Sequence, residues 1–168
     1  DGVDACVERV RRSRFYQEGG VIGLNIGKNA STTLEDANQD YVMCMKAVYQ
    51  VASYITANIS SPNTKNLRDL QGETLLRQLL SALHQARIAL SDQYGVRKPL
   101  FLKIAPDLQA NDFKFIADLL LEFEIDAVIA TNTTISRVDV ATLPHGNESG
   151  GLSGSPVLSL SNQAIHHL

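Results

Sequence analysis

Four short runs of apolar residues recur along the chain, and each is bounded by turn-forming or helix-capping residues. The runs cover residues 21–26, 54–59, 99–105 and 127–131. Each is almost continuously hydrophobic, which is typical of parallel strands that are covered on both faces, whereas a half-exposed antiparallel strand alternates apolar with polar residues. The pattern therefore predicts four buried parallel strands.

The segments around these runs have the three- and four-residue spacing of amphipathic helices. Thr32 and Glu35 have the spacing of a capping box, which predicts that one helix begins at about Leu34. Helices are predicted over residues 3–10, 34–48, 73–91 and 112–122, and from 158 to the end. The order is a helix followed by strands and helices in alternation, which is typical of a parallel α/β chain with right-handed crossovers.

Two architectures have this order of elements: an open, doubly wound sheet and a closed (β/α)₈ barrel. The glycine spacings that bind dinucleotides or nucleoside triphosphates follow none of the four strands, and Asn-Ile-Gly-Lys-Asn at residues 25–29 matches neither motif. A barrel enzyme has its site at the carboxyl ends of the strands. This chain has its unusual polar residues at those ends, which favours the barrel.

Composition and charge describe a soluble globular chain and exclude several functions. Of the 168 residues, 44% are hydrophobic, and 15 Lys and Arg stand against 18 Asp and Glu, a formal charge of −3. This balance argues against intrinsic disorder and against nucleic-acid binding. No apolar run reaches the roughly 18 residues of a membrane-spanning helix. Cys6 and Cys44 are expected to be buried reduced thiols, and no metal-ligand spacing is present.

The two ends of the sequence have the character of cuts through structure. The chain starts at Asp1 without a methionine, directly before a helical pattern, and it stops at Leu168 inside another. Natural termini are usually polar and frayed. A closed barrel also takes about 250 residues, so we expect these 168 residues to be a fragment of a longer polypeptide.

Each predicted strand carries a polar side chain near its carboxyl end, which is unusual for a buried parallel strand. These residues are Asn25, Asn58, Lys103 and Thr131, the last followed by Asn132 and Thr133. A buried polar group without a partner costs on the order of 1–3 kcal/mol, so four such strands in succession indicate convergence on one polar ligand. The alternative is that each residue ties down its own loop. Amides beside a single cation suit a flat heterocycle that acquires negative charge.

The loop after the second strand, Ser60-Ser61-Pro62-Asn63-Thr64, is a candidate for the reactive centre. Pro62 biases Ser61 toward extended geometry, which would aim the hydroxyl into the mouth of a barrel; an ordinary Ser-Pro-Asn turn is the alternative. The polar stretch at 65–72 is predicted to be a flexible lid over the site. A Gly-rich loop at 150–156 offers main-chain amides that could meet a cofactor.

Several motifs in one order carry a resemblance to a known family. They are Gly23-Leu24-Asn25-Ile26-Gly27-Lys28-Asn29, Asn58-Ile59-Ser60-Ser61-Pro62-Asn63-Thr64, Leu67-Arg68-x-Leu70-Gln71, Lys103-Ile104-Ala105-Pro106-Asp107-Leu108, Thr131-Asn132-Thr133-Thr134 and Gly150-Gly151-Leu152-Ser153-Gly154. Across essentially the whole chain the sequence closely resembles class 2 dihydroorotate dehydrogenase of the γ-proteobacterial kind. The resemblance implies a partial (β/α)₈ TIM barrel of about four βα units, matching the third to sixth strands. Residues 1–168 would then be the central part of a single FMN-binding barrel domain, truncated at both ends.

The resemblance also implies an activity, partners and a location. The family oxidises dihydroorotate to orotate in the synthesis of pyrimidines and UMP, with FMN as cofactor, and class 2 members pass the electrons to a quinone. Class 2 members associate peripherally with the cytoplasmic side of the inner membrane through N-terminal helices, which have no counterpart in these 168 residues. No nucleic acid is implied as a partner.

The roles of individual residues follow from the same resemblance. Ser61 matches the catalytic base of the family. Class 1 enzymes have a cysteine at this position, so Ser-Ser-Pro-Asn indicates class 2. Family contacts to FMN match Asn25, Asn58, Lys103, Thr131 and Gly154, and contacts to the pyrimidine match Asn58, Asn63, Asn132 and Thr133. Ser61 would take a proton from C5 of dihydroorotate while C6 delivers hydride to the flavin, and Lys103 would stabilise the growing negative charge. Since a serine is a poor base, it would need a proton acceptor beyond it, such as water near Thr64.

Two alternatives from other functional classes stay open at this point. One is a non-catalytic half-barrel that retains these residues but lacks activity on its own. The other is a barrel enzyme that forms a Schiff base at Lys103, although the surrounding asparagines argue against it. Flavin that co-purifies and bleaches with dihydroorotate would separate the leading hypothesis from the first alternative, and borohydride trapping with a carbonyl substrate would test the second.

Overall fold

The four apolar runs form a parallel sheet whose strands follow one another in chain order. In this computed structural model, which describes residues 2–168, the sheet has the order β1-β2-β3-β4. The strands are β1 (Gly23–Ile26), β2 (Tyr54–Asn58), β3 (Leu100–Ile104) and β4 (Ala127–Ala130). Every predicted strand is confirmed, with bounds that differ by no more than two residues. Asp1, where the expected domain begins, lies outside the described residues.

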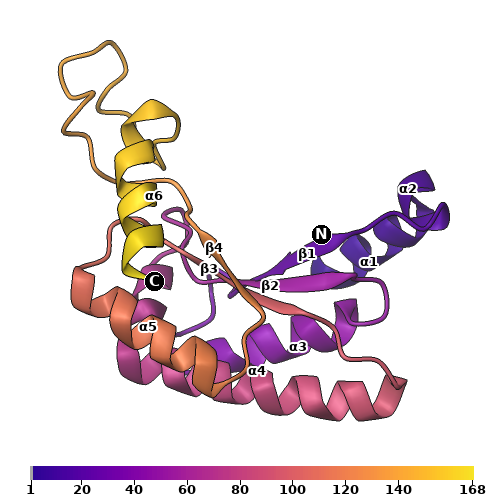
Figure 1. The fold of residues 1–168 in the computed structure, drawn as a ribbon. Helices are drawn as coiled ribbons and strands as arrows, with labels where there is room; N and C mark the ends of the chain where they lie inside the picture. The colour runs from indigo at the N-terminus through magenta and orange to yellow at the C-terminus, as the bar shows by residue number, and fades with distance from the viewer. Residues whose placement is uncertain (1) are drawn as a thin grey trace.

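The helices alternate with the strands as the spacing predicts. They are α1 (Gly2–Arg12), α2 (Arg14–Gln17), α3 (Ala37–Val48), the 3₁₀ helix η1 (Leu67–Gln71), α4 (Glu73–Tyr94), α5 (Ala110–Glu122) and α6 (Ser155–His167). Figure 1 shows α3, α4 and α5 on one side of the sheet, and α6 beside the carboxyl end of β4. The short α2 and η1 were not predicted, because four or five residues leave too little periodicity to recognise.

The start of α3 differs from the prediction. The helix begins at Ala37 rather than Leu34, and the capping box of Thr32 and Glu35 does not form. The ammonium group of Lys28 donates to the main-chain oxygen of Thr32 at 2.7 Å. The N–H of Asp36, which would bond to that oxygen in a helix, instead donates to the side chain of Thr33 at 3.3 Å. Lys28 therefore holds this segment in turns and delays the helix.

The other helix ends have recognisable caps. α4 runs three residues past the predicted end to Tyr94 and stops at Gly95, which has a positive φ of 69° and donates its N–H to Ser91. α5 begins two residues earlier than predicted, because the carboxylate of Asp112 accepts a hydrogen bond from the N–H of Gln109 at 2.8 Å.

The hydrophobic core lies between the sheet and the helices on one side of it. Alternate strand residues face the helices and are fully buried, together with the apolar stripe of α4; they include Ile55, Ala57, Leu100, Leu102, Ile104, Leu76, Leu79, Leu80 and Leu83. The expectation of cover on both faces is met on one face only. On the other face Tyr54 and Phe101 are half-buried, and their rings stack with centroids 4.7 Å apart. The open face is therefore lined by strand side chains rather than covered by helices.

Ion pairs join β3 to β4 at the amino end of the sheet. The carboxylate of Asp126 accepts from Arg87 at 2.9 Å, from Arg97 at 2.6 Å and from the N–H of Leu100 at 2.8 Å. Arg87 is buried on α4, with 3% of its side chain exposed. This network ties α4 to the start of both strands.

The two cysteines are free thiols, half-buried rather than buried as expected. Burial, followed by the nearby charge of Asp40, raises the pKa of Cys44, so this thiol is protonated at neutral pH. Among residues 2–168, no helix is long and apolar enough to cross a bilayer.

Candidate functional site

The predicted site residues lie at the carboxyl ends of neighbouring strands. Asn58, the last residue of β2, is the register partner of Lys103 on β3, and Asn25 of β1 is the partner of Thr56. Register partners in a parallel sheet point to the same face. The side chains of Asn25, Asn58 and Lys103 therefore share the open face of the sheet, and Thr131 follows directly after β4.

A hydrogen-bonded chain joins the ends of β2 and β4. The amide oxygen of Asn58 accepts from the hydroxyl of Ser60 at 2.8 Å and from its N–H at 3.2 Å. The amide nitrogen of Asn132 donates to the same hydroxyl at 3.0 Å. Ser60 is fully buried, and the sequence pattern assigned it no role. It holds the two asparagines together and leaves the amide nitrogen of Asn58 available to a ligand.

Ser61 stands at the edge of this chain, half-buried, with Pro62 after it. Its hydroxyl oxygen accepts a hydrogen bond from the N–H of Asn63 at 3.3 Å. In the part of the chain that the structure describes, no carboxylate or imidazole is hydrogen-bonded to Ser61. The hydroxyl is thus oriented by the main chain of its own loop, and a proton acceptor would have to come from elsewhere.

Lys103 is a half-buried cation on the open face. Within residues 2–168 its ammonium group has neither a hydrogen bond nor an ion pair, and the side-chain amide of Asn25 has no partner either. A cation that is not engaged by the protein is available to bind a negatively charged or electron-rich group. The group that best fits this face is therefore polar and anionic or able to take negative charge.

The residues after β4 hold one another in place. The oxygen of the Asn132 side chain accepts from the N–H of Thr133 at 2.8 Å, and the hydroxyl of Thr131 donates to the carbonyl of Asn132 at 2.9 Å. The peptide bond between Ala130 and Thr131 is cis. These hydrogen bonds hold the loop after β4 in one conformation.

Arg68 and Asp107 form a second group at the same end of the sheet, to which the sequence analysis assigned no role. The guanidinium of Arg68 donates to the carbonyl of Ser60 at 3.0 Å, to Asp107 at 2.7 Å and to the carbonyl of Thr133 at 2.9 Å. Two of these three partners are main-chain oxygens, which lie 8 and 65 residues from Arg68 along the chain. The only available signal was the presence of both charged residues in the motifs that carry the resemblance.

The predicted lid at 65–72 is largely fixed rather than flexible. Within it, η1 buries Leu67, Leu70 and Gln71, and the side chain of Gln71 accepts from the N–H of Ala105 at 2.8 Å. Within 65–72, Lys65, Asn66, Asp69 and Gly72 are exposed, so only part of the segment faces solvent. The lid prediction is therefore wrong for residues 67–71, because two leucines three residues apart provide enough apolar surface to pack this segment down.

The Gly-rich loop lies against the end of β4. Leu152 pairs with Thr134 in an antiparallel bridge. A Cβ on Gly151 would lie 1.9 Å from the hydroxyl oxygen of Thr133, so only glycine fits there. Gly154 is exposed at the start of α6 with a φ of 85°, and no hydrogen bond joins it to the strand-end residues in the described part of the chain.

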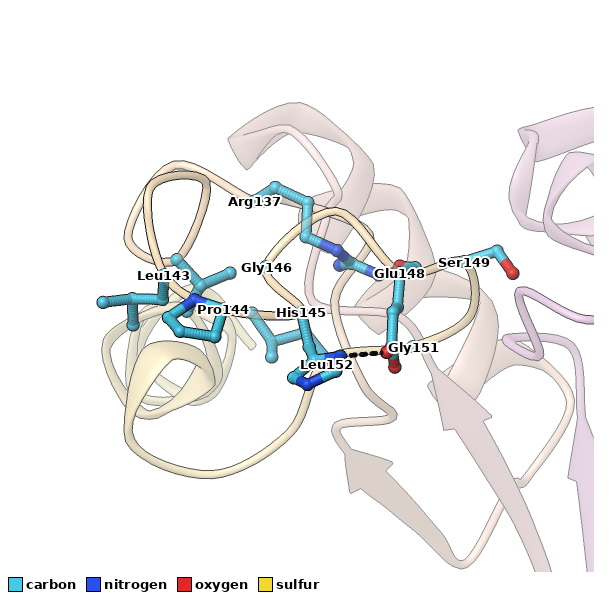
Figure 2. Close-up of a pocket in the computed structure, with 10 residues that line it drawn as sticks. Arg137, Leu143, Pro144, His145, Gly146, Glu148, Ser149, Gly151 and Leu152 are labelled. Carbon is cyan, nitrogen blue, oxygen red and sulfur yellow. Dashed lines mark hydrogen bonds and ion pairs between the residues drawn. The ribbon is translucent and has the colours of Figure 1, made fainter.

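A cavity of about 250 Å³ lies in the long connection from β4 to α6 (Figure 2). Arg137 closes this loop by donating to the carbonyls of Glu148 at 3.0 Å and Gly150 at 2.7 Å. The Nδ1 atom of His145 and a carboxylate oxygen of Glu148 lie 2.6 Å apart on its wall, and both side chains are exposed. Among the described residues, none of those matched to a catalytic, FMN or pyrimidine role lines this cavity, although Gly151 and Leu152 of the Gly-rich loop do.

Comparisons with known proteins identify close relatives. Residues 1–168 match the family described as dihydroorotate dehydrogenase. The chain is 67% identical over its whole length to a dihydroorotate dehydrogenase (quinone) of Polynucleobacter asymbioticus, covering 49% of that protein. It is 58% identical over 99% of its length to one of Cupriavidus taiwanensis, covering 48%. The chain thus spans about half the length of these relatives.

A solved structure gives the same picture of the fold. The chain is similar to the dihydroorotate dehydrogenase of Eimeria tenella crystallised with ferulenol, with a TM-score of 0.85 and 35% identity. The match covers 99% of this chain and 49% of that one. A ligand-free structure of the same protein gives a TM-score of 0.82.

Proposed function

Because the chain belongs to the dihydroorotate dehydrogenase family, we propose that it is the central part of an enzyme that oxidises dihydroorotate to orotate. In this proposal residues 1–168 belong to a single barrel domain that binds FMN, and a quinone is the final electron acceptor. The relatives named as quinone enzymes support the acceptor. The observation that carries the proposal is the unpaired cation of Lys103 beside the amides of Asn25 and Asn58, on the open face of the sheet.

The donor set at the strand ends fits a flavin. Lys103 provides a cation for a ring that becomes electron-rich, and Asn25 and Asn58 provide amide groups for its polar edge. Thr131 and Gly154 complete the set proposed to hold FMN, and Gly151 permits close approach of the main chain. When bound, FMN supplies the two-electron acceptor that the oxidation of a carbon–carbon single bond requires.

Four residues are proposed to hold the pyrimidine substrate: Asn58, Asn63, Asn132 and Thr133. Asparagine amides present both a donor and an acceptor, which matches the alternating N–H and C=O groups of a pyrimidine edge. The bonds from Ser60 to Asn58 and Asn132 fix two of these amides before the substrate arrives. This preorganisation lowers the entropic cost of aligning the substrate.

Ser61 is proposed to be the catalytic base that accepts the proton from C5 of dihydroorotate. Its hydroxyl has no protein base as partner in the described residues, and we propose that the proton passes onward to water. Asn63 orients the hydroxyl oxygen through its N–H.

Association with a membrane belongs to the same proposal. A quinone acceptor dissolves in the bilayer, so an enzyme that uses it would lie peripherally on the membrane, in a bacterium on the cytoplasmic side of the inner membrane. The names of the relatives support the acceptor and not the mode of attachment.

The test is a Ser61→Ala variant of the native protein, meaning the protein expressed from its complete natural reading frame. The native protein is expected to reduce its flavin with dihydroorotate and then to reduce a quinone analogue. The variant should reduce its flavin about 10²–10⁴-fold more slowly, the usual contribution of a positioned base. Its orotate affinity, measured from the shift of the flavin absorbance, should change by less than about threefold, because the hydroxyl is not proposed to bind the ring.

Ser91→Ala on α4, remote from the strand ends, is the matched control and should leave both quantities unchanged. Equal losses of rate and of orotate affinity in Ser61→Ala would make Ser61 a binding residue. A native protein that carries flavin but does not bleach with dihydroorotate would overturn the proposed function and favour a non-catalytic module.

A further inference from the structure

Arg68 occupies a point where the loops after three strands meet. It lies on η1, and its guanidinium reaches the carbonyl of Ser60 after β2, the carboxylate of Asp107 after β3 and the carbonyl of Thr133 after β4. Its side chain is 18% exposed and that of Asp107 is 21% exposed. No other described side chain is bonded to the loops after all three strands.

The two carbonyls belong to residues adjacent to the proposed reacting groups. Ser60 immediately precedes Ser61, the proposed base, and Thr133 immediately follows Asn132, a proposed substrate ligand. Thr133 is itself a proposed substrate ligand. Bonds from one rigid, planar guanidinium to both carbonyls set the distance between the two loops. A shift in that distance moves the base relative to the substrate.

Asp107 orients the guanidinium and extends the contact. Its second carboxylate oxygen accepts from the hydroxyl of Thr134, and the N–H of Ile135 also donates to the carboxylate, at 3.3 Å. Asp107 thus fixes Arg68 from one side and the chain after Thr133 from the other. Its charge offsets that of Arg68, so the pair adds little net charge near the ligand.

We propose that Arg68 is a positioning residue of the active site, which sets Ser61 in register with Asn132 and Thr133 and is itself oriented by Asp107. The role rests on the proposed function. A lysine would retain the charge but not the three directed bonds, because an ammonium group on a flexible stem cannot span these partners in fixed geometry. The fork shape of the guanidinium, rather than its charge, therefore carries the role.

The experiment compares Arg68→Ala, Arg68→Lys and Asp107→Asn in the native protein. Flavin reduction by dihydroorotate should slow about 100-fold in Arg68→Ala, the effect of displacing a reacting group by about 1 Å. The rate of flavin reduction in Arg68→Lys should be close to that in Arg68→Ala. The rate in Asp107→Asn should lie between these two rates and that of the native protein. Added guanidinium should restore part of the rate in Arg68→Ala but none in Ser61→Ala, since the latter lacks the base itself.

Hydrogen exchange gives a readout that does not depend on turnover. In Arg68→Ala, amides of residues 59–64 and 132–136 should exchange faster, while those of α4 should not change. Arg77→Ala is the matched control, because Arg77 makes an exposed ion pair with Glu122 away from the strand ends. It should alter neither the rate nor the exchange of the two loops.

Several results would overturn the role of Arg68. Flavin reduction at the native rate in Arg68→Ala, or at the native rate in Arg68→Lys, would do so. A loss of rate in Arg68→Ala that is fully explained by loss of bound flavin would do so too, as would unchanged amide hydrogen exchange in both loops. Failure of the proposed function would look different, because the native protein itself would then not oxidise dihydroorotate. In that case faster exchange of both loops in Arg68→Ala would still support the positioning contact.

Discussion

Within residues 2–168, ion pairs occur at both ends of the sheet, but the carboxyl end also carries an unpaired cation. At the amino end, Arg87, Arg97 and Asp126 satisfy one another. At the carboxyl end, Lys103 is left without a partner among the described residues. In barrel enzymes the amino-end face contributes stability and the carboxyl-end face carries the site. In the described part of the chain, Lys103, unlike the paired charges at both ends of the sheet, is therefore the cation that is free to contact a ligand.

The amino-end network predicts a dependence of stability on pH through Asp126. Burial alone would raise the pKa of Asp126, but hydrogen bonds from Arg97 and Leu100 and the charges of Arg97 and Arg87 outweigh it, so the pKa is lowered. A lowered pKa means stabilisation that is fully present above the unfolded value of about 3.9 and is lost as the pH falls through the folded value. Asp126→Asn should therefore destabilise the native protein at neutral pH.

The loss of stability expected in Asp126→Asn depends on how exposed the ion pair between Asp126 and Arg87 is. Breaking a fully buried ion pair costs about 3–5 kcal/mol, and partial exposure of Asp126 lowers the expectation to about 2–3 kcal/mol. Urea unfolding at pH 7 measures it, and the difference from the native protein should shrink below about pH 4. Glu122→Gln, which breaks an exposed pair, should cost less than about 1 kcal/mol. A difference that stayed constant down to pH 2 would contradict the assignment to Asp126.

Single residues were predictable where their signal lay in the sequence itself. Lys103 and Asn58 stood out because a polar side chain in an apolar run is anomalous. Arg68 and Ser60 did not, because their roles depend on main-chain oxygens or side chains on distant segments, and such partners leave no pattern in composition or spacing. The site residues named by resemblance remain predictions, although the structure brings Asn58 and Asn132 together through Ser60.

At the scale of elements, the strands were predictable and the short connections were not. Buried parallel strands require apolar runs of four to six residues, which few other segments contain. η1 is a 3₁₀ helix of five residues, and its packing depends on the buried side chains of Leu67 and Leu70. The start of α3 depends on Lys28 holding the carbonyl of Thr32. Neither the packing of η1 nor this side-chain bond to a main-chain oxygen is encoded in hydrophobic periodicity, so the first was missed and the second was misplaced.

The Gly-rich loop yields a prediction about how an element is held. A methyl group at Gly151 would lie 1.9 Å from the hydroxyl oxygen and 2.7 Å from the Cβ of Thr133, and the Cβ cannot rotate away. Gly151→Ala should therefore push the loop from the end of β4 and weaken flavin binding at least tenfold, about 1.4 kcal/mol. The loss of bound flavin is measured by comparing the flavin absorbance of the purified variant with that of the purified native protein.

A second substitution tests whether the clash is the cause. Thr133→Ala removes the hydroxyl and methyl groups but not the Cβ, so it should restore part of the flavin content when combined with Gly151→Ala. The coupling between the two substitutions measures their contact. Simple addition of the two losses would show that Gly151 acts by another route.

At the scale of the whole molecule, the predicted partial barrel is confirmed by the likeness to dihydroorotate dehydrogenase structures, of which the chain covers about half. The four strands follow one another in parallel register, as successive strands of a barrel do. The consequence is a sheet with one face covered by helices and the other open (Figure 1). The outer edges of β1 and β4 have no strand partner within the described residues.

A polypeptide of these 168 residues alone should therefore be poorly stable or self-associated, and inactive as a dehydrogenase. Open sheet edges and an open face carrying Tyr54 and Phe101 provide surfaces for association between copies. The half-sheet also cannot enclose a ligand from both sides, so Lys103 and the asparagines would face water, where each interaction with a substrate is weaker. Sedimentation across a tenfold range of concentration should show oligomers or aggregates, and quinone-analogue reduction should be absent. A monomer that unfolds cooperatively and oxidises dihydroorotate would contradict the prediction and would show that four strands suffice to build the site.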